Sequence, residues 1–252
     1  MLKVDNLQVR YHKLGTPVLR GASLELGQGE VGIVLGKNGS GKTTLFKNIL
    51  GIEKPDSGTI AFDGENLLKM RRRERARRIA YVPQHIHFGD LTVFDSVLMG
   101  RVSYFGMKAG LADYAAVEKI LTDMHLESFA GRSAEALSGG EKQKIAIARA
   151  MAQEPRLMIF DEPTGNLDIA NEQLIIREAK KLARENNISI LSSLHDLNQA
   201  LYFGDKFFFL KDGIVKYAGG RDIFSEEVIR DIFDIDVHLQ TIGGKLVILP
   251  VL

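Results

Sequence analysis

The sequence predicts an α/β fold in which a mainly parallel sheet ends in ligand-binding loops. Short apolar runs alternate along the chain with segments of helical pattern, and several runs stop directly in polar or glycine-rich turns. The runs that predict strands lie at residues 31–35, 79–82, 157–160, 188–192 and 207–210. Because ligands in such folds bind at the carboxyl ends of the strands, the residues after these runs are the first candidates for a site.

The segments outside this core have other patterns. Residues 1–30 alternate and turn often, which predicts an antiparallel β layer. Residues 88–135 have helical patterns at 91–99 and 112–124, with glycine interruptions and no strand run, so we expect an inserted α-helical subdomain. Residues 221–252 predict a short helix and then a hairpin of 237–241 and 245–252.

The expected organisation has four parts. They are the N-terminal part of the α/β core with the β layer at 1–87, the helical subdomain at 88–135, the remainder of the core with a further helix at 136–220, and the terminal helix and hairpin at 221–252.

A glycine-rich nonapeptide gives the strongest local signal. Residues 36–44 match the phosphate-binding pattern G-x-x-x-x-G-K-[ST], between a predicted buried strand and a predicted helix. Glycines let consecutive N–H groups point at phosphate oxygens, and the helix N-terminus adds partial positive charge. We expect Lys42 to reach the β- and γ-phosphates of a nucleoside triphosphate and Thr43 to bind Mg²⁺. The residues assigned to the nucleotide here are Gly36, Asn38, Gly39, Ser40, Gly41, Lys42, Thr43 and Thr44. The core is therefore predicted to be of the P-loop NTPase class.

A second segment ends a predicted strand in two carboxylates. Four apolar residues are followed by Asp161, Glu162 and Pro163. A Mg²⁺–triphosphate site needs acidic oxygen ligands at the end of a buried strand. We assign Asp161 to the metal, directly or through water, and Glu162 to the orientation of an attacking water.

A third segment, residues 137–141, reads Leu-Ser-Gly-Gly-Glu before a predicted helix at 143–151. Ser138 and Glu141 have the spacing of a capping box, which by itself accounts for a helix start. Gly139 and Gly140 weaken that start unless something must approach the backbone closely. These four residues are therefore candidates for a second anion-binding helix N-terminus.

Composition restricts the class of partner. The chain has 252 residues with 33 Lys plus Arg against 32 Asp plus Glu, and this balance argues against a polyanion such as nucleic acid as the main ligand. Cysteine is absent, which excludes disulfides and thiolate metal sites and suits a reducing cytoplasm. We find no export signal, and no apolar stretch approaches the roughly 18–20 residues that cross a bilayer. Any membrane role is therefore expected to come through a partner.

Together, the segments at 36–44, 137–141 and 158–162 resemble the nucleotide-binding subunit of ATP-binding cassette (ABC) transporters. The resemblance covers roughly residues 2–220. It implies that Tyr11 stacks on adenine, that Gln84 senses Mg²⁺ and the attacking water and links to the membrane partner, and that His195 contacts the γ-phosphate. It also implies that the loop Gly165-Asn166-Leu167-Asp168 passes between two subunits, with Asp168 beside the nucleotide.

The resemblance implies a mechanism with two copies packed head to tail. Ser138, Gly139 and Gly140 of one copy cap the γ-phosphate that Lys42 of the other copy holds. Glu162 acts as general base or water-orienting carboxylate, and His195 stabilises the transition-state charge. ATP then holds the dimer closed and hydrolysis releases it. Departures from the family pattern are Lys37, where proline is frequent, and Thr43 in place of a frequent serine.

The single cassette favours one class within the family. Cassettes of translation are usually tandem, and chromosome or repair ATPases carry a long coiled coil, whereas residues 85–136 here hold a compact helical insert. An ATPase docked on separate transmembrane permease subunits is therefore favoured, with a soluble iron–sulfur cluster assembly ATPase as the alternative. This class implies a place at the cytoplasmic face of the membrane and, indirectly, a substrate-binding protein.

Two stretches indicate the group of transporter. Residues 91–101 and 193–200 resemble importers of iron chelates, haem and cobalamin and the related molybdate–tungstate systems. The transported molecule does not touch such a subunit, so no residue here identifies it. We interpret the arginine-rich run at 71–78 as a solvated helix. We interpret His85 and His87 as part of a polar loop rather than as a metal clip.

Overall fold

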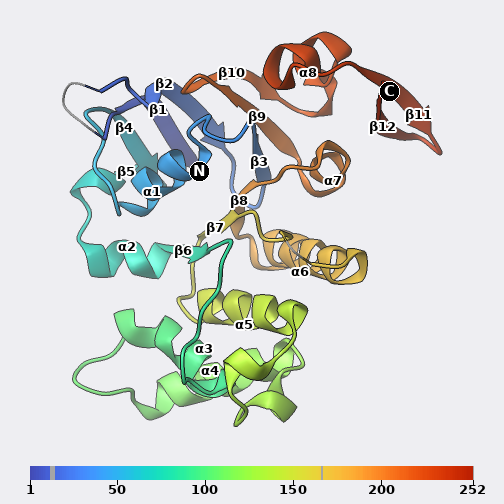
Figure 1. The fold of residues 1–252 in the computed structure, drawn as a ribbon. Helices are drawn as coiled ribbons and strands as arrows, with labels where there is room; N and C mark the ends of the chain where they lie inside the picture. Colours follow the sequence, from blue (N-terminus) through green and yellow to red (C-terminus); the bar gives the residue numbers. More distant parts are fainter. Residues whose placement is uncertain (12–14, 166, 252) are drawn as a thin grey trace.

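The computed structural model describes residues 1–11, 15–165 and 167–251, and it has the predicted α/β architecture (Figure 1). Figure 1 shows two β layers above a helical region, with the terminal hairpin at the far end from that region. Two predicted positions, Asn166 in the loop at 165–168 and Leu252 at the end of the hairpin, lie outside the described residues. Within the described ranges, none of the helices is both long and apolar enough to span a bilayer.

The central sheet has six strands, of which five are parallel. They are Val31–Leu35 (β3), Ile79–Val82 (β6), Leu157–Asp161 (β7), Ser189–Ser193 (β8), Lys206–Lys211 (β9) and Ile214–Gly219 (β10). Their order in space is β10-β9-β3-β8-β7-β6, with only β10 antiparallel to its neighbour. Strands β3, β7 and β8 are buried along their whole length, as continuous apolar runs predict. The loops after β3, β8, β7 and β6 therefore meet at one edge of the sheet.

The predicted antiparallel layer packs beside this sheet. Its strands are Leu2–Val9 (β1), Leu19–Leu26 (β2), Ser57–Phe62 (β4) and Glu65–Asn66 (β5), in the order β2-β1-β4-β5. The terminal hairpin consists of Val237–Ile242 (β11) and Lys245–Pro250 (β12).

Helices cover the sheets and form the inserted region. They are Lys42–Leu50 (α1), Arg72–Arg78 (α2), Val93–Leu98 (α3), Leu111–Asp123 (α4), Gly139–Met151 (α5), Ile169–Asn186 (α6), Leu197–Phe203 (α7) and Glu226–Phe233 (α8). Short 3₁₀ turns lie at Leu67–Lys69 (η1), Met99–Ser103 (η2), Glu127–Phe129 (η3), Ala134–Ala136 (η4) and Arg221–Ile223 (η5). Residues 88–135 are helical as expected, with one isolated bridge between Thr92 and Ser133. The proposed limits of the subdomains remain predictions.

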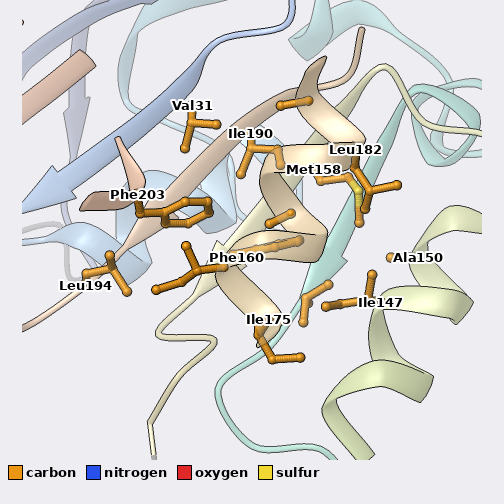
Figure 2. Packing of buried hydrophobic residues seen from close by; sticks show 14 of the residues in the cluster. Val31, Ile147, Ala150, Met158, Phe160, Ile175, Leu182, Ile190, Leu194 and Phe203 are labelled. Carbon is orange, nitrogen blue, oxygen red and sulfur yellow. The ribbon is translucent and has the colours of Figure 1, made fainter. Parts of the chain in front are cut away.

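Two apolar cores hold these layers together. In the larger one, Figure 2 shows Ile175 and Leu182 of α6 between the strand residues Phe160 and Ile190 and the α5 residue Ile147. The smaller core fills the space between the antiparallel layer, α1 and the other face of the central sheet. Each fully buried Ile, Leu or Phe side chain contributes about 1.5–3 kcal/mol relative to exposure. Helix α5 is thus fixed to the central sheet both directly, at β6, and through α6.

Most element boundaries differ from prediction by one or two residues, for local reasons, whereas the helix expected at 143–151 begins four residues earlier, at Gly139. The strand expected at 188–192 is Ser189–Ser193, because Asn187 ends α6 in a left-handed conformation and the chain must first turn. The helix expected at 91–99 begins at Val93, because the Thr92 side chain caps it by accepting the Asp95 N–H.

The arginine-rich run is helical as predicted, but the prediction that it is solvated throughout is wrong at Arg75. This side chain is 8% exposed, and its guanidinium donates to the carbonyl oxygens of Leu67, Met70 and Leu50. Burial lowers the pKa of Arg75. The side chain therefore joins α2, η1 and the end of α1, which begins at the glycine-rich loop.

We expect Arg75→Ala to lower the free energy of unfolding by about 2–3 kcal/mol, because buried carbonyls lose a charged donor. Arg72→Ala, on the exposed face of the same helix, is the matched control and should stay within about 0.5 kcal/mol of the native chain. Urea denaturation measures the free energy of unfolding of both variants. Equal stability of the two variants would contradict the assigned role.

Candidate nucleotide site

The glycine-rich loop connects the buried strand β3 to the first turn of α1. A Cβ at Gly36 would lie 2.2 Å from the Leu210 carbonyl oxygen, so only glycine fits there. Gly41, at φ 110°, caps α1 in a left-handed conformation that favours glycine. The Ser40 hydroxyl is buried and has no hydrogen-bond partner among the described residues. A buried orphan hydroxyl beside a helix N-terminus fits a loop that binds an anion.

The Lys42 ammonium lies inside this loop. Its Nζ donates to the carbonyl oxygens of Gly36 at 2.8 Å and Lys37 at 3.2 Å. Burial lowers the pKa of Lys42, while the Glu162 and Asp161 carboxylates oppose that shift. The cation is thus held against the backbone of the loop, where it faces the phosphate position that the sequence predicts.

Lys37, which stands where the family often has proline, joins the loop to the terminal segment. Its ammonium pairs with Asp234, the residue that ends α8, and this contact lowers the pKa of Asp234. Both side chains are well exposed, so the pair contributes little to stability.

Asp161 ends β7 and is 6% exposed. Its Oδ1 accepts the Ser193 hydroxyl at 2.8 Å, and its Oδ2 accepts the Thr43 hydroxyl at 3.3 Å and the Tyr81 hydroxyl at 3.4 Å. Burial, reinforced by this carboxylate, raises the pKa of Tyr81 to about 12. The structure therefore brings together Thr43 and Asp161, two of the three predicted metal ligands, of which Gln84 is the third.

Glu162 lies at the centre of the remaining predicted catalytic residues. Its Oε2 accepts Gln84 Nε2 at 2.5 Å, and its Oε1 lies 2.5 Å from His195 Nε2. The Ser193 hydroxyl accepts the Glu162 N–H at 3.0 Å. Glu162 has a φ of 50°, which turns the chain sharply where β7 ends and costs about 1–2 kcal/mol. Side chains that follow β6, β7 and β8 thus converge on one carboxylate.

A small pocket of 190 Å³ opens beside this carboxylate, lined in part by Glu162 and His195. Two of its polar residues were not predicted from the sequence. The Thr164 hydroxyl donates to Gln199 Oε1 at 2.8 Å, and Gln199 Nε2 donates to Glu172 at 3.1 Å. Ser193 was also missed as a site residue, although a polar residue at the end of a strand beside the acidic strand is a usable signal.

Tyr11 lies beside the first turn of α1 rather than in the pocket next to Glu162. Its hydroxyl is 2.9 Å from the Thr44 hydroxyl, and the side chain is 52% exposed. The ring is thus fixed at one point and largely exposed, and its adenine-stacking role remains a prediction.

The Leu-Ser-Gly-Gly-Glu segment starts α5, and its capping box forms as predicted. Glu141 Oε2 accepts the Ser138 N–H at 2.8 Å, and the Ser138 hydroxyl accepts the Glu141 N–H at 3.4 Å. A Cβ at Gly140 would lie 2.2 Å from Asn171 Oδ1, so a larger residue here would have to displace the Asn171 side chain of α6. Gly139 has more space, with its nearest contact to Leu167 at 3.4 Å.

This segment lies beside the predicted interface loop and apart from Lys42. Asp168 caps α6 by accepting the Asn171 N–H at 2.8 Å, and Asn171 in turn faces Gly140. Figure 1 shows α1 against the antiparallel layer and α5 on the helical side of the molecule. One chain therefore presents two separate candidate phosphate sites.

The geometry as a whole defines a P-loop nucleotide site with an oriented acid, a histidine and a glutamine at one sheet edge. A family model described as ABC transporter matches residues 19–165. The chain belongs to the ABC transporter family, as an ATP-binding cassette with ATPase activity.

Named relatives are similar over nearly the whole chain. An uncharacterized ABC transporter ATP-binding protein of Methanocaldococcus jannaschii is 37% identical, over 100% of this chain and 98% of its own. A hemin import ATP-binding protein of Streptomyces coelicolor is 32% identical over 96% and 88% of the two chains. A molybdate/tungstate import ATP-binding protein of Pyrococcus horikoshii is 34% identical over 91% and 66%.

Solved structures have the same fold. An inward-facing ABC transporter described as of metal-chelate type superposes with a TM-score of 0.85 at 29% identity, over 100% of this chain and 97% of the other. A dimeric cassette bound to ADP and Pi after hydrolysis gives a TM-score of 0.76 at 29% identity, over 87% and 98%.

We expect Ser193→Ala to lower kcat for ATP hydrolysis by about tenfold, because both Asp161 and the Glu162 backbone lose their shared partner. The matched control is Ser189→Ala on the same strand, whose hydroxyl donates to the Gly27 carbonyl at 2.9 Å. Steady-state phosphate release measures both. An equal loss in the two variants would assign Ser193 to packing rather than to the site.

Proposed function

We propose that two copies of this chain close head to tail on ATP and drive an importer for a metal chelate, for cobalamin or haem, or for an oxyanion. The observation that carries the proposal is the convergence of Gln84, Glu162 and His195 at the sheet edge that also holds the glycine-rich loop. Phosphoryl transfer to water needs this combination of positioned carboxylate and charge-stabilising groups.

Each side chain has a role that follows from its position. Lys42 neutralises the β- and γ-phosphates, with its ammonium turned from the loop carbonyls to the phosphate oxygens. Glu162 orients the attacking water and accepts its proton. His195 donates to the γ-phosphate, which requires that its 2.5 Å contact with Glu162 opens when ATP binds. Gln84 holds the same carboxylate from the opposite side.

The oxygen atoms of Thr43 and Asp161 fit a Mg²⁺ ion. They lie 3.3 Å apart beside the loop, and hydroxyl, carboxylate and amide oxygens are the hard donors that this ion prefers. Thr43, Asp161 and Gln84 would hold it. When bound, the ion neutralises negative charge on the phosphate oxygens.

The separation of the two candidate phosphate sites supports the head-to-tail arrangement. The N-terminus of α5 carries partial positive charge and exposes Ser138 and Gly139, apart from Lys42 of its own chain. A second copy supplies the missing half, so that Ser138, Gly139 and Gly140 of one copy contact the γ-phosphate held by the other. Asn171 contacts both Asp168 and Gly140. Asp168 would therefore also lie at the contact between the two copies.

We expect Glu162→Gln to bind Mg-ATP, to lose about 100-fold or more of its turnover and to accumulate as an ATP-stabilised dimer. The amide keeps the shape of the carboxylate but cannot accept a proton from water. Gel filtration with light scattering, with and without Mg-ATP, measures the dimer. Lys42→Ala is the control and should remain monomeric with ATP. A Glu162→Gln variant that is monomeric under saturating Mg-ATP would contradict the two-copy model.

A groove of 690 Å³ between the nucleotide core and the helical region supports a membrane partner. It is lined from α1, α2, η2 and α5, with Ile52 and Met99 more than half exposed and Arg72 and Arg149 beside them. Burial lowers the pKa of Arg149, and Arg149 forms no salt bridge within the described ranges. We infer that a short amphipathic segment of a permease subunit, with an acidic residue toward the arginines, binds here.

We expect Met99→Glu to keep ATP hydrolysis while it removes copurifying polytopic membrane subunits, because the new carboxylate opposes the acidic segment and breaks the apolar contact. The matched control is Ile214→Glu, an exposed residue of β10 away from the groove. Affinity purification from detergent-solubilised membranes with quantitative mass spectrometry measures the partner. Recovery of iron–sulfur scaffold proteins in place of polytopic subunits would instead support the soluble assembly ATPase.

The names of similar proteins support the proposed direction of transport, import, and the proposed class of transported molecule. Proteins similar to this chain are named for hemin and for molybdate/tungstate import, and the similar transporter structure is described as of metal-chelate type. We propose that the chain works at the cytoplasmic face of the membrane, receives cargo indirectly from a substrate-binding protein and has no nucleic-acid partner.

A further inference from the structure

A second large pocket lies away from the nucleotide site, between α6, α7 and the terminal hairpin. Its volume is 540 Å³. Lys180 of α6, Arg221 of η5 and Lys245 of β12 line it together with an apolar wall that includes Leu201 and Leu246. In Figure 1 this part of the molecule lies at the far end from α3 and α4. It shares no lining residue with the pocket at Glu162.

The positive charges of this pocket lie near one another, and one acid, Asp205, acts on Lys180. Within the part of the chain that the structure describes, Lys180, Arg221 and Lys245 form no salt bridge. Burial lowers the pKa of Lys180, and the neighbouring Arg184, Arg221 and Lys245 lower it further, whereas Asp205 raises it. Cations that repel one another in a partly buried space favour an anionic ligand.

Contacts with the Tyr202 ring and with the hairpin fix the walls of the pocket, in which Lys180 is partly buried and Arg221 and Lys245 are exposed. The Tyr202 ring holds the Lys180 Nζ 4.4 Å and the Lys245 Nζ 5.9 Å from its centroid, and Lys180 also donates to the Tyr202 carbonyl. The hairpin wall is fixed by Asn198, which donates to the Ile248 carbonyl at 2.9 Å and accepts the Ile248 N–H at 2.8 Å. Ile248 is itself buried in the larger core.

We propose that this pocket binds a phosphorylated organic metabolite of about nucleotide size. A phosphate group with two negative charges fits between Lys180, Arg221 and Lys245. The volume lies in the range of small-molecule sites and far exceeds a phosphate ion, and the walls at Leu201 and Leu246 suit an organic body. Because the pocket uses none of the ATPase residues, the proposal does not rest on the proposed transport function.

The test uses the full-length chain with Lys42→Ala, which weakens phosphate binding in the glycine-rich loop. Isothermal titration with AMP and with pyrophosphate, in phosphate-free buffer, should show saturable binding of AMP. Adding Lys245→Ala or Arg221→Ala should weaken this binding about tenfold or more. Lys181→Ala, an exposed lysine next to Lys180 on α6, is the matched control and should leave it unchanged. In the background with native Lys42, Lys245→Ala should leave basal ATP hydrolysis unchanged.

Three results would overturn the proposal. One is an absence of saturable AMP binding. Another is an equal loss in the Lys181→Ala and Lys245→Ala variants, which would indicate general surface charge. The third comes from co-sedimentation with phosphatidate vesicles: binding to vesicles alone, lost in Lys245→Ala, would assign the pocket to a lipid headgroup instead of a soluble metabolite.

Discussion

The hydrogen bonds of the Asp161 carboxylate organise the nucleotide site. One oxygen accepts the Ser193 hydroxyl of β8, and the other accepts Thr43 of α1 and Tyr81 of β6. These bonds connect the elements that carry the phosphate loop, the acidic pair, the histidine and the glutamine. Because the carboxylate is buried, loss of any partner leaves a charged group unsatisfied, and the bonds therefore fix the relative positions of the loops. Glu162, for which we propose the catalytic role, follows Asp161 directly and has a left-handed backbone.

Two charged groups of the nucleotide site, Lys42 and Glu162, each have partners within the protein. Lys42 donates to loop carbonyls, and Glu162 is held between Gln84 and His195. Both arrangements satisfy charges that a triphosphate and a water would otherwise satisfy. In the second pocket, Lys180 donates to the Tyr202 carbonyl, and Lys180, Arg221 and Lys245 form no salt bridge within the described residues. The absence of acidic partners is the physical basis for assigning a separate anionic ligand to this pocket.

Much of the fold was predictable because the patterns are local. The runs at β3 and β6 were located to the residue, and the capping box of Ser138 and Glu141 forms as its spacing predicts. Prediction failed where a distant contact decides the outcome. Arg75 belongs to a charged run but is buried, because its guanidinium donates to carbonyls of two other segments, the end of α1 and the η1 turn. Thr164, Gln199 and Ser193 were given no role in the site from the sequence, and only their contacts with neighbours place them there.

The sequence by itself determined the phosphate loop, the acidic strand end and the glycine pair that starts α5, because each is a short pattern with a local physical cause. Only the tertiary structure decided which of them meet. The strand order β3-β8-β7-β6 brings Thr43, Asp161, Glu162, His195 and Gln84 to one edge. Helix α5, which begins at Gly139, lies apart from α1, which begins at Lys42. The same holds for the basic pocket, whose residues come from three distant segments. Strand order and packing depend on long-range contacts, which no local pattern contains.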